Sequence, residues 1–363
     1  MRLAFITSTP PTVRDGSGTY VGISVLARAL EEQGHTVVTI TPPHGPTPLG
    51  HAAQRIGFNL LAERRLRAAS TASGGAPFDA VIGFDLDGCL LRHRQPFVAS
   101  IKGVLAEELT FERGVVRASL WLQSRFERRN VRRAPLVLTT SEYARGRIAR
   151  NYGVRPAKIA VVPELIDLDH WRTALAAAGP RRDRTPTILT VCHLYPRKSV
   201  AVLLRAMPQV LAAVPGARLR VVGIGPEATS LEQLRQTLQL ERSVAFLGHI
   251  PFDRLAGEYR DCALFCLPSR QEGFGIVFLE AMAAARAVVA CHAAAMPEVV
   301  PGGIAGRLVA PGDPASLATA LIALLRDPAH ADTLGQQGAR HVAAYDAPRI
   351  AARFLDAIKP VLM

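Results

Sequence analysis

Short apolar strand patterns alternate with helix patterns along almost all of this 363-residue chain. Parallel strands need a crossover connection, which is usually a helix, so the alternation predicts a mostly parallel sheet with helices on both faces. The expected strands lie at 2–8, 35–41, 79–83, 96–101 and 134–141, and then at 187–192, 217–223, 244–248, 262–269, 287–291 and 305–311.

The pattern restarts after ALAAAGPRRDRTP (174–186), a stretch without apolar periodicity that we interpret as a connector. We therefore expect an α/β fold of two doubly wound, Rossmann-like domains, at 1–165 and 186–345, that face a central cleft. The amphipathic segment 346–363 is expected to form a last helix that crosses back to the first domain. Ligands of such folds bind at the carboxyl ends of the strands.

The chain is strongly basic, with a formal net charge of +13 and a pI of about 10.3. Such a field attracts nucleic acid, acidic lipid surfaces or phosphorylated small molecules. Aromatic residues are only 6% of the chain, which disfavours stacking on single-stranded nucleic acid, and we expect no nucleic-acid partner. The helix pattern WLQSRFERRNVRR carries Trp121, Leu122, Phe126 and Val131 among its arginines, so it is either a membrane-facing helix or a solvated one.

No stretch approaches the ~18–20 apolar residues of a membrane span, and the apolar run in MRLAFITSTPP is too short for a signal-peptide core. The cysteines form no CxxC pair, which indicates buried, reduced thiols; they are Cys89, Cys192, Cys262, Cys266 and Cys291. We therefore expect a cytoplasmic protein, and the basic helix leaves open a peripheral position at the inner face of a membrane.

The segment PSRQEGFGIVFLEAM (268–282) carries the most chemical information. A strand pattern ends at Leu267, a Gly-rich turn follows, and a helix pattern starts near Gly275 or Ile276. The first amides of a helix and its dipole favour anions, and the glycines let a diphosphate approach the backbone closely. Glu272 on the turn and Glu280 inside the helix place a carboxylate on each side of this anion site. Such a site suits two hydroxyl-bearing groups, such as a hexose and a ribose.

The stretch EGFGIVFLE resembles the Glu-x7-Glu signature of retaining family-4 glycosyltransferases of GT-B fold. TVCHLYPRKSVAVLLRAMP is similar to the strand, loop and helix in which that family holds the donor diphosphate, and VVGIGPE and PEVVPGGIAGRLVAPGDPASLATAL resemble its later segments. TPPTVRDGSGTYVGISVLARALEEQGHTV looks like the family's first Gly-rich loop and helix. The resemblance extends over nearly the whole chain and is strongest over 187–325.

The resemblance implies that Glu272 contacts the donor sugar hydroxyls, that Glu280 accepts hydrogen bonds from the ribose, and that Lys198 neutralises the diphosphate leaving group. It also implies a donor-binding role for the glycine-rich positions and their neighbours, which are Gly16, Gly18, Gly248, Gly273, Phe274, Gly275 and Ile276.

Two candidate catalytic positions depart from the family pattern. His193 stands where the family usually has Arg, and an imidazole stabilises a leaving diphosphate less than a guanidinium does. Lys102 stands where the family usually has His, and we hypothesise that its cation binds an anionic group on the acceptor or the donor. In addition, Pro163-Glu164-Leu165 replaces a frequent Pro-Asn-Gly, so the acceptor wall near the linker is expected to differ.

The sequence GFDLDGCLL (83–91) raises a second possibility, because an Asp-x-Asp-Gly at a strand end is used by haloacid-dehalogenase-type phosphatases. In that class the first carboxylate attacks phosphorus and the second moves the proton. Here about 80 residues of alternating pattern precede the motif, and no paired acidic motif for magnesium follows at a suitable place. We therefore expect Asp85 and Asp87 to line the acceptor side of the cleft or to cap the following segment.

The resemblance implies an enzyme that moves a sugar from a nucleotide-diphosphate sugar, with a UDP-sugar favoured, to a hydroxyl acceptor in glycolipid, polysaccharide or secondary-metabolite synthesis. The acceptor would be anionic or lipid-linked, and peripheral contact with an acidic membrane would accompany it. Lys198 and the helix amides would take the place of a metal, so no metal or other cofactor is expected. The alternatives are the phosphatase and a basic anion-binding scaffold without catalysis.

Overall fold

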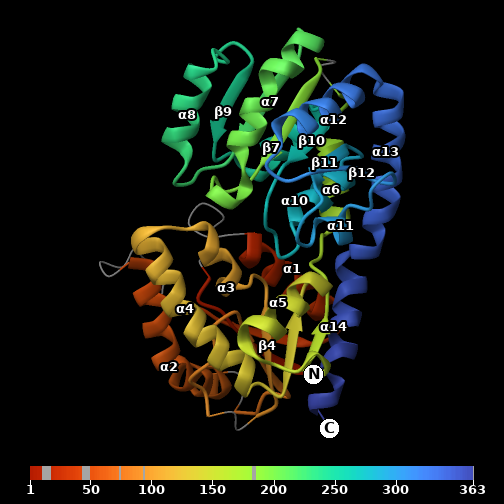
Figure 1. The fold of residues 1–363 in the computed structure, drawn as a ribbon. Helices are drawn as coiled ribbons and strands as arrows, with labels where there is room; N and C mark the ends of the chain where they lie inside the picture. The colour runs from red at the N-terminus through yellow and green to blue at the C-terminus, as the bar shows by residue number, and fades with distance from the viewer. Residues whose placement is uncertain (10–17, 43–49, 73–74, 93–94, 182–184, 363) are drawn as a thin grey trace. The chain divides into compact units, whose positions relative to one another are not determined.

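The structure is a computed structural model that describes residues 1–9, 18–42, 50–72, 75–92, 95–181 and 185–362 (Figure 1). The chain forms two compact units. The first consists of Met1–Leu165 together with Ala347–Met363, and the second of Ile166–Asp346.

Among the described residues, the first unit holds a parallel six-stranded sheet in the order β2-β1-β3-β4-β5-β6. Its strands are β1 (Arg2–Ile6), β2 (Thr36–Ile40), β3 (Ala80–Phe84), β4 (Phe97–Ile101), β5 (Leu136–Thr139) and β6 (Ile159–Val161). Its helices are α1 (Gly18–Glu32), α2 (Gly50–Ala72), α3 (Leu105–Glu108), α4 (Gly114–Arg133), α5 (Glu142–Tyr152) and α14 (Ala347–Leu362).

Alternate residues of β1 face opposite layers of this unit, as the two-residue repeat of a strand requires. Leu3 and Phe5 belong to the core under α1 and α14, whereas Ala4 and Ile6 belong to the core under α2, α4 and α5. All four side chains are fully buried, so β1 has helices on both of its faces.

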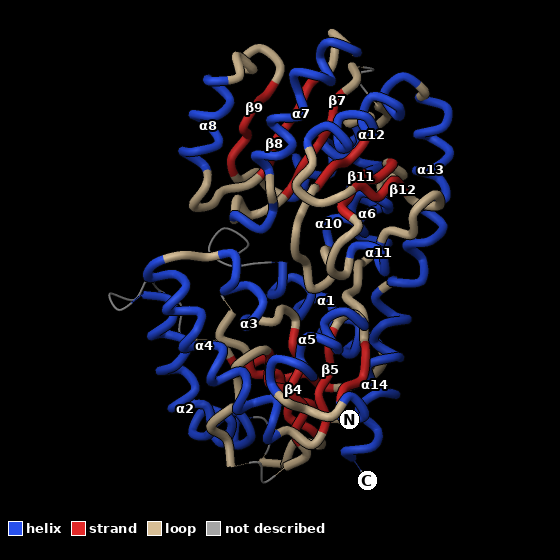
Figure 2. Tube along the Cα trace, viewed as in Figure 1, coloured by secondary structure: helices blue, strands red, loops and turns tan. Residues whose placement is uncertain are grey.

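In its described residues, the second unit holds a parallel six-stranded sheet in the order β12-β11-β10-β7-β8-β9 (Figure 2). Its strands are β7 (Thr187–Val191), β8 (Arg218–Val222), β9 (Val244–Gly248), β10 (Leu264–Leu267), β11 (Ala287–Cys291) and β12 (Gly306–Val309). Its helices are α6 (Leu168–Ala178), α7 (Val200–Ala213), α8 (Ala228–Thr237), α9 (Phe252–Asp261), α10 (Ile276–Ala283), α11 (Met296–Val299), α12 (Pro314–Arg326) and α13 (Pro328–His341).

The predicted fold class of two doubly wound α/β units is confirmed. Two local predictions were wrong. Residues 174–178, expected in a connector, complete α6, because Asp167 caps this helix, Leu168 and Trp171 anchor it in the core, and its alanines favour helix. The short strand β6 was not expected, because three residues of apolar sequence are too few to show a period.

Candidate functional site

The strand order of the second unit decides which of its loops meet. The chain leaves β7 toward β8 and β9 on one side and returns to β10 on the other side of β7. Ligands of open α/β sheets bind beyond the carboxyl ends of the strands at such a reversal of strand order. The two loops at this point are 192–199 and 268–275, and they contain His193, Lys198, Glu272 and the turn from Gly273 to Gly275.

Hydrogen bonds join these two loops directly. The backbone N–H of Arg270 donates to the carbonyl of Arg197 at 2.8 Å, and Arg197 Nε donates to Gln271 Oε1 at 3.0 Å. The guanidinium and the backbone of one residue therefore fix the first loop against the second.

The glycines of VVGIGPE explain how the first loop is supported from below. A Cβ at Gly223 would lie 1.8 Å from the carbonyl oxygen of Cys192, and one at Gly225 would lie 2.6 Å from the backbone nitrogen of Leu194. Only glycine permits this close approach, so Gly-x-Gly here positions the loop after β7 and does not form a dinucleotide fingerprint.

Lys198, which is half-buried, and Glu272, which is buried, form an ion pair between the two loops. Lys198 Nζ lies 2.6 Å and 2.7 Å from the two carboxylate oxygens, and Ser269 Oγ donates to Glu272 Oε1 at 2.7 Å. Burial alone would raise the pKa of Glu272, but the Lys198 ammonium and the Arg197 guanidinium outweigh it and lower this pKa below its usual value. Glu272 is therefore an ionised carboxylate and a hydrogen-bond acceptor at neutral pH.

The helix α10 begins next to this pair without a side-chain cap. Its N-cap is Gly275, with φ of +95°, and a Cβ there would lie 2.6 Å from the ring of Phe278, so the turn requires glycine. Gly273 precedes it on the turn, Ile276 is the first helical residue, and the Phe274 side chain is buried against Tyr345 with ring centroids 5.6 Å apart. An uncapped helix start favours a bound anion.

Glu280 lies farther along α10 and has a separate partner. The buried Tyr259 hydroxyl donates to Glu280 Oε2 at 2.8 Å. Burial raises the pKa of Glu280 to about 7, although the Tyr259 hydrogen bond lowers it in part. This carboxyl group therefore changes its charge near neutral pH.

The remaining predicted donor residues are more scattered. His193 follows β7 at the start of the first loop, half-buried, with its ring 5.9 Å from that of Tyr195. Gly248 ends β9 at φ of +63° and accepts a backbone hydrogen bond from Gly223. Gly18 is the exposed first residue of α1, and Gly16 lies outside the described residues.

In the first unit the order of strands reverses between β1 and β3, and Asp87 connects the ends of these strands. Its carboxylate is fully buried and accepts hydrogen bonds from Ser8 N at 2.6 Å, from Ser8 Oγ at 2.8 Å and from Asn59 Nδ2 at 2.7 Å. Burial raises the pKa of Asp87 to about 6. These bonds join β1, α2 and the turn after β3, so Asp87 holds three segments together.

Asp85 occupies a left-handed backbone position, with φ of +55°. Its carboxylate accepts from the backbone N–H of Lys102 at 2.9 Å and lies 3.7 Å from the Arg55 guanidinium, while burial raises its pKa. Asn130 Nδ2 donates to the carbonyls of both Asp85 and Asp87. Asp85 is therefore the less constrained of the two carboxylates, and neither is arranged as a free nucleophile.

Lys102 forms an ion pair with Glu164, which is the other position in this unit that departs from the family pattern. Its Nζ lies 2.9 Å from Glu164 Oε2, and both side chains are buried, with exposed fractions of 7% and 5%. The Lys102 cation is thus met by a carboxylate of its own unit. Its binding of an anionic substrate group stays a prediction.

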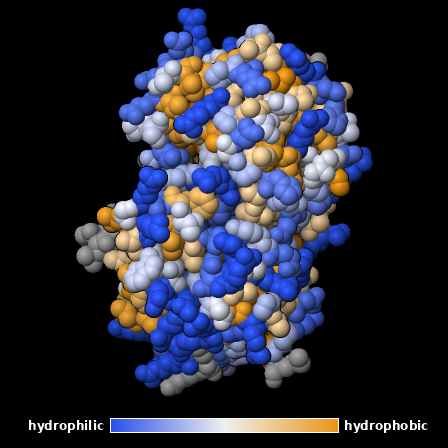
Figure 3. Space-filling model, viewed as in Figure 1, coloured by the Kyte–Doolittle hydropathy of each residue, from blue (hydrophilic) through white to orange (hydrophobic). Residues whose placement is uncertain are grey.

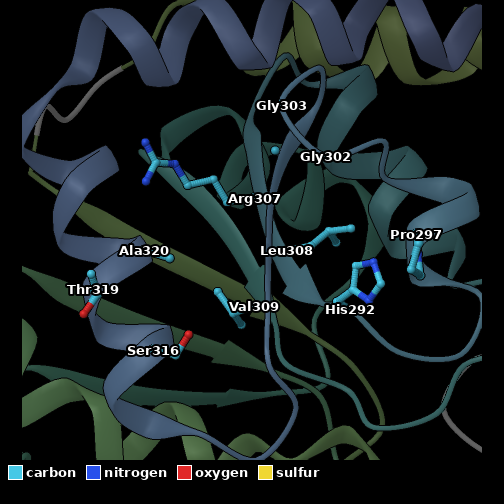
Figure 4. A pocket seen from close by; sticks show the side chains of 11 residues that line it. His292, Pro297, Gly302, Gly303, Arg307, Leu308, Val309, Ser316, Thr319 and Ala320 are labelled. Atoms are coloured by element: carbon cyan, nitrogen blue, oxygen red, sulfur yellow. The ribbon is translucent and has the colours of Figure 1, made fainter.

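The cavity shown in Figure 4 is separate from this pair of loops. It has a volume of about 760 Å³ and is lined from β12 and α12, and by His292 and Gly302 among others. None of the predicted site residues lines it. Within the described part of the chain, no cluster of three or more His, Cys, Asp or Glu side chains could hold a metal ion.

Sequence reasoning missed the supporting residues Arg197, Ser269, Gln271 and Tyr259. The sequence did offer a signal for two of them, because Arg197 directly precedes Lys198 and Ser269 is a polar residue just after a strand. Tyr259 had none, because its contact with Glu280 joins two helices across 21 positions of sequence.

Two family models match consecutive parts of the chain. Residues 16–170 match the model described as Glycosyltransferase Family 4, and residues 185–327 match that described as Glycosyl transferases group 1. In fold, the chain is similar to the sucrose-phosphate synthase of Thermosynechococcus elongatus, with a TM-score of 0.80 at 22% identity over 99% of this chain and 98% of that one.

Curated relatives match part of the chain. A GDP-mannose-dependent alpha-(1-6)-phosphatidylinositol monomannoside mannosyltransferase of Mycolicibacterium smegmatis is 32% identical over 57% of this chain and 57% of its own length. D-inositol 3-phosphate glycosyltransferase 2 of Catenulispora acidiphila is 32% identical over 61% of this chain and 55% of its own. The chain thus spans little more than half the length of these relatives.

Proposed function

We propose that this chain, which belongs to the family 4 glycosyltransferases, transfers a sugar from a nucleotide-diphosphate sugar to a hydroxyl acceptor with retention of anomeric configuration. The observation that carries the proposal is the Lys198–Glu272 ion pair beside the uncapped start of α10. Here a cation, helix amides and an ionised carboxylate lie at the reversal of strand order, which is the set of groups that a sugar diphosphate needs.

The chemistry follows from these groups. A donor diphosphate against the first turn of α10 meets the helix amides and the Lys198 ammonium, which stabilise the negative charge that develops as the bond from sugar to diphosphate breaks. Glu272 accepts hydrogen bonds from the donor sugar and so orients it. The acceptor oxygen bonds to the anomeric carbon, and its proton passes to the departing diphosphate oxygen on the same face. The protein contributes electrostatic stabilisation and positioning.

This mechanism includes no metal, because Lys198 and the α10 amides supply the positive charge. Activity is therefore expected to be unchanged after EDTA treatment and dialysis. Activity that is lost with EDTA and restored by Mg²⁺ or Mn²⁺ would contradict metal independence, while leaving the sugar-transfer proposal intact.

For the donor, GDP-mannose is the first candidate, because one curated relative carries it in its name. The UDP-sugar favoured from the sequence has no support from these relatives. For the acceptor, the names of both relatives point to phosphorylated inositol, free or in a lipid. An anionic acceptor of this kind also suits a chain with a net charge of +13.

Calorimetry with GDP and UDP, followed by hydrolysis and transfer assays over a panel of nucleotide sugars, tests the proposal. We expect binding of one nucleoside diphosphate and turnover of its sugar. Lys198→Ala should lower kcat about 10²–10³-fold, as removal of one charge-stabilising donor does in other enzymes, and Lys198→Arg should recover part of it. Lys359→Ala, at an exposed lysine of α14, is the matched control and should have no effect.

Three results would count against this function. Absence of binding by any nucleotide sugar would remove the donor site. Binding without turnover, accompanied by binding of unrelated polyanions, would favour the basic scaffold. Phosphate release from a generic phosphoester that depends on Asp85 would instead support the phosphatase, which the geometry of Asp85 and Asp87 does not favour.

A further inference from the structure

Large apolar side chains are exposed at the start of α4. Val115, Val116, Trp121 and Leu122 are 86%, 52%, 55% and 42% exposed. Among the described residues ten large hydrophobic side chains are exposed, and these four lie within eight positions of one helix. Singly exposed apolar residues are ordinary, but such a concentration on one short segment indicates contact with an apolar phase.

Arginines near the two ends of α4 differ in how they are engaged. Those near its C-terminus are engaged with the fold, since Arg129 and Arg133 donate to the carbonyl of Cys89 and Arg132 donates to that of Tyr152. Arg113 and Arg117, near its start, are exposed and form no ion pair among the described residues. The first two turns of α4 therefore combine accessible cations with accessible apolar groups.

No accessible carboxylate on α4 offsets these cations. The only acidic residue of the helix is Glu127, which is fully buried and accepts hydrogen bonds from Tyr152 and from the backbone of Leu105. Arg125 lies over the Trp121 ring, with its guanidinium carbon 5.7 Å from the ring centroid. This pairing leaves a charged group next to the aromatic ring, as at a membrane interface.

The neighbouring helix α2 also exposes large apolar side chains. Leu60 and Leu61 are 69% and 48% exposed, and Arg64 beside them is exposed as well. Arg55 Nη1 of α2 donates to Gln123 Oε1 of α4 at 3.3 Å, and Figures 1 and 2 show the two helices side by side. In Figure 3 hydrophobic and hydrophilic surface alternates on the flank of the first unit where Figure 1 labels these helices.

We propose that the start of α4 (Arg113–Arg125) docks on the surface of an anionic lipid bilayer. Trp121, Val115, Val116 and Leu122 would enter the boundary between headgroups and acyl chains, and Arg113 and Arg117 would contact the acidic headgroups. The structure moves the docking segment toward the start of the helix from the one expected, because Val131 is fully buried and Phe126 is half-buried.

Docking of this kind is interfacial and not transmembrane. In the described residues no helix has the length and apolarity to cross a bilayer. The mixture of aliphatic side chains with one tryptophan also suits lipid better than nucleic acid, which needs several aromatic rings for stacking. The inference goes beyond the proposed function and does not depend on the donor chemistry.

Tryptophan fluorescence gives a direct test, because the chain has two tryptophans. Trp171 is 5% exposed, so Trp171→Phe leaves Trp121 as the reporter. On titration with phosphatidylglycerol-containing vesicles we expect a blue shift of the emission, weakened by salt, and little shift with phosphatidylcholine vesicles. In co-sedimentation, the unaltered full chain should likewise bind the phosphatidylglycerol-containing vesicles more strongly than the phosphatidylcholine vesicles.

Two sets of variants separate charge from apolar contact. Arg113→Ser with Arg117→Ser should weaken vesicle binding roughly 30-fold, from about 1 kcal/mol per basic residue near an anionic surface. Val115→Asp with Val116→Asp should weaken it at least tenfold. The matched controls are Arg349→Ser with Arg353→Ser on α14, which removes the same charge from exposed positions, and Ile304→Asp in the second unit. Both controls should bind as the unaltered chain does.

Several outcomes would overturn the inference. These are absence of vesicle binding, equal binding to neutral and anionic vesicles, or equal weakening by the α4 variants and their controls. Binding of RNA homopolymer in place of vesicles, or self-association that the α4 variants abolish, would assign the surface to a different occupant. Nucleotide-sugar calorimetry on the same variants keeps a failure of docking distinct from a failure of the donor site.

Discussion

Glu272 and Glu280 show how neighbours decide the charge of a carboxyl group. Both lie on one turn and helix of the second unit, eight positions apart. Glu272 has a lysine and an arginine beside it, which lower its pKa despite burial. Among the described residues, Glu280 has the Tyr259 hydroxyl as its partner, and burial raises its pKa to about 7. One carboxylate is therefore ionised at neutral pH, and the other titrates near neutral pH.

This difference predicts a pH dependence that belongs to Glu280. Its folded-state pKa lies above the unfolded value of 4.5, so the folded chain binds this proton more tightly, and Glu280 lowers the free energy of unfolding as pH rises from about 4.5 to about 7. Denaturation curves should therefore show that Glu280→Gln is more stable than the unaltered chain at pH 8, by about 1–3 kcal/mol, with the difference shrinking toward pH 5. Equal stability of the two proteins at both pH values would contradict this environment for Glu280.

Lys102 and Glu164 are both departures from the pattern of the family, and the structure places them against each other. A buried ion pair is costly to break from one side, because the remaining charge loses its partner in a poorly solvated place. The two departures are thus physically coupled, since the carboxylate that forms the ion pair with Lys102 is the glutamate at position 164.

A double-mutant cycle measures this coupling. Lys102→Met and Glu164→Gln should each destabilise the chain by about 3 kcal/mol, and the double variant should lose about 1–3 kcal/mol less than their sum. The KM for the acceptor, measured on the same four proteins, tests the role proposed for Lys102 as an anion receptor. A rise in KM in Lys102→Met but not in Glu164→Gln would support that role, and additive stability changes would refute the coupling.

At the scale of elements, the turn into α10 depends on one glycine. Gly275 has φ of +95°, and a Cβ at this position would clash with the Phe278 ring. Gly34 has a similar φ of +82°, but a Cβ there would meet no other atom within 4 Å. Gly34→Ala therefore measures backbone strain alone, about 1–2 kcal/mol, and Gly275→Ala adds a steric clash. Gly275→Ala should cost more stability than Gly34→Ala and should also weaken nucleotide binding in calorimetry. Unchanged nucleotide affinity would place the diphosphate away from α10.

The turn after β3 depends on the hydrogen bonds that the Asp87 carboxylate accepts. Asp87→Asn replaces one acceptor oxygen by an N–H₂ group that faces the donors of Ser8 and Asn59, and we expect a loss of about 1–3 kcal/mol at pH 7.5. Asp85→Asn is the matched control, because asparagine tolerates the left-handed backbone and keeps the acceptor for the Lys102 N–H. Thermal unfolding should show the larger loss for Asp87→Asn. The reverse order would mean that Asp85 has the structural role.

Most strands and the start of α10 could be predicted from sequence, because β-branched runs and a Gly-rich turn are local signals. The partners of the site residues could not. The pairing of Lys198 with Glu272 spans 74 positions, and that of Lys102 with Glu164 spans 62, so each depends on which strands become neighbours. The roles of Gly223 and Gly225 were hidden for the same reason, since the backbone that they approach belongs to another strand end.

At the scale of the whole molecule, the two ends of the chain build one unit. The helix α14 begins at Ala347, packs with α1, and places Ile350, Phe354 and Ile358 in the core of the first unit. The second unit, Ile166–Asp346, is thus inserted in the chain between the main part of the first unit and its last helix. Stability of the first unit therefore depends on residues that follow the second unit in sequence.

Substitutions in the cores of the two units should separate the stability of the first unit from nucleotide binding. Phe354 is 1% exposed and its ring centroid lies 6.1 Å from that of Phe5, so Phe354→Ala should destabilise the first unit by about 3–5 kcal/mol. Phe265 is fully buried in the second unit, 6.0 Å from the Phe278 ring of α10, and Phe265→Ala is its counterpart.

Nucleoside diphosphate stabilises whatever unit binds it, in proportion to the logarithm of its concentration. In thermal scans with and without nucleotide, Phe354→Ala should lower one transition and leave the nucleotide-dependent shift unchanged, whereas Phe265→Ala should reduce that shift. Loss of the shift in Phe354→Ala would show that donor binding requires an intact first unit.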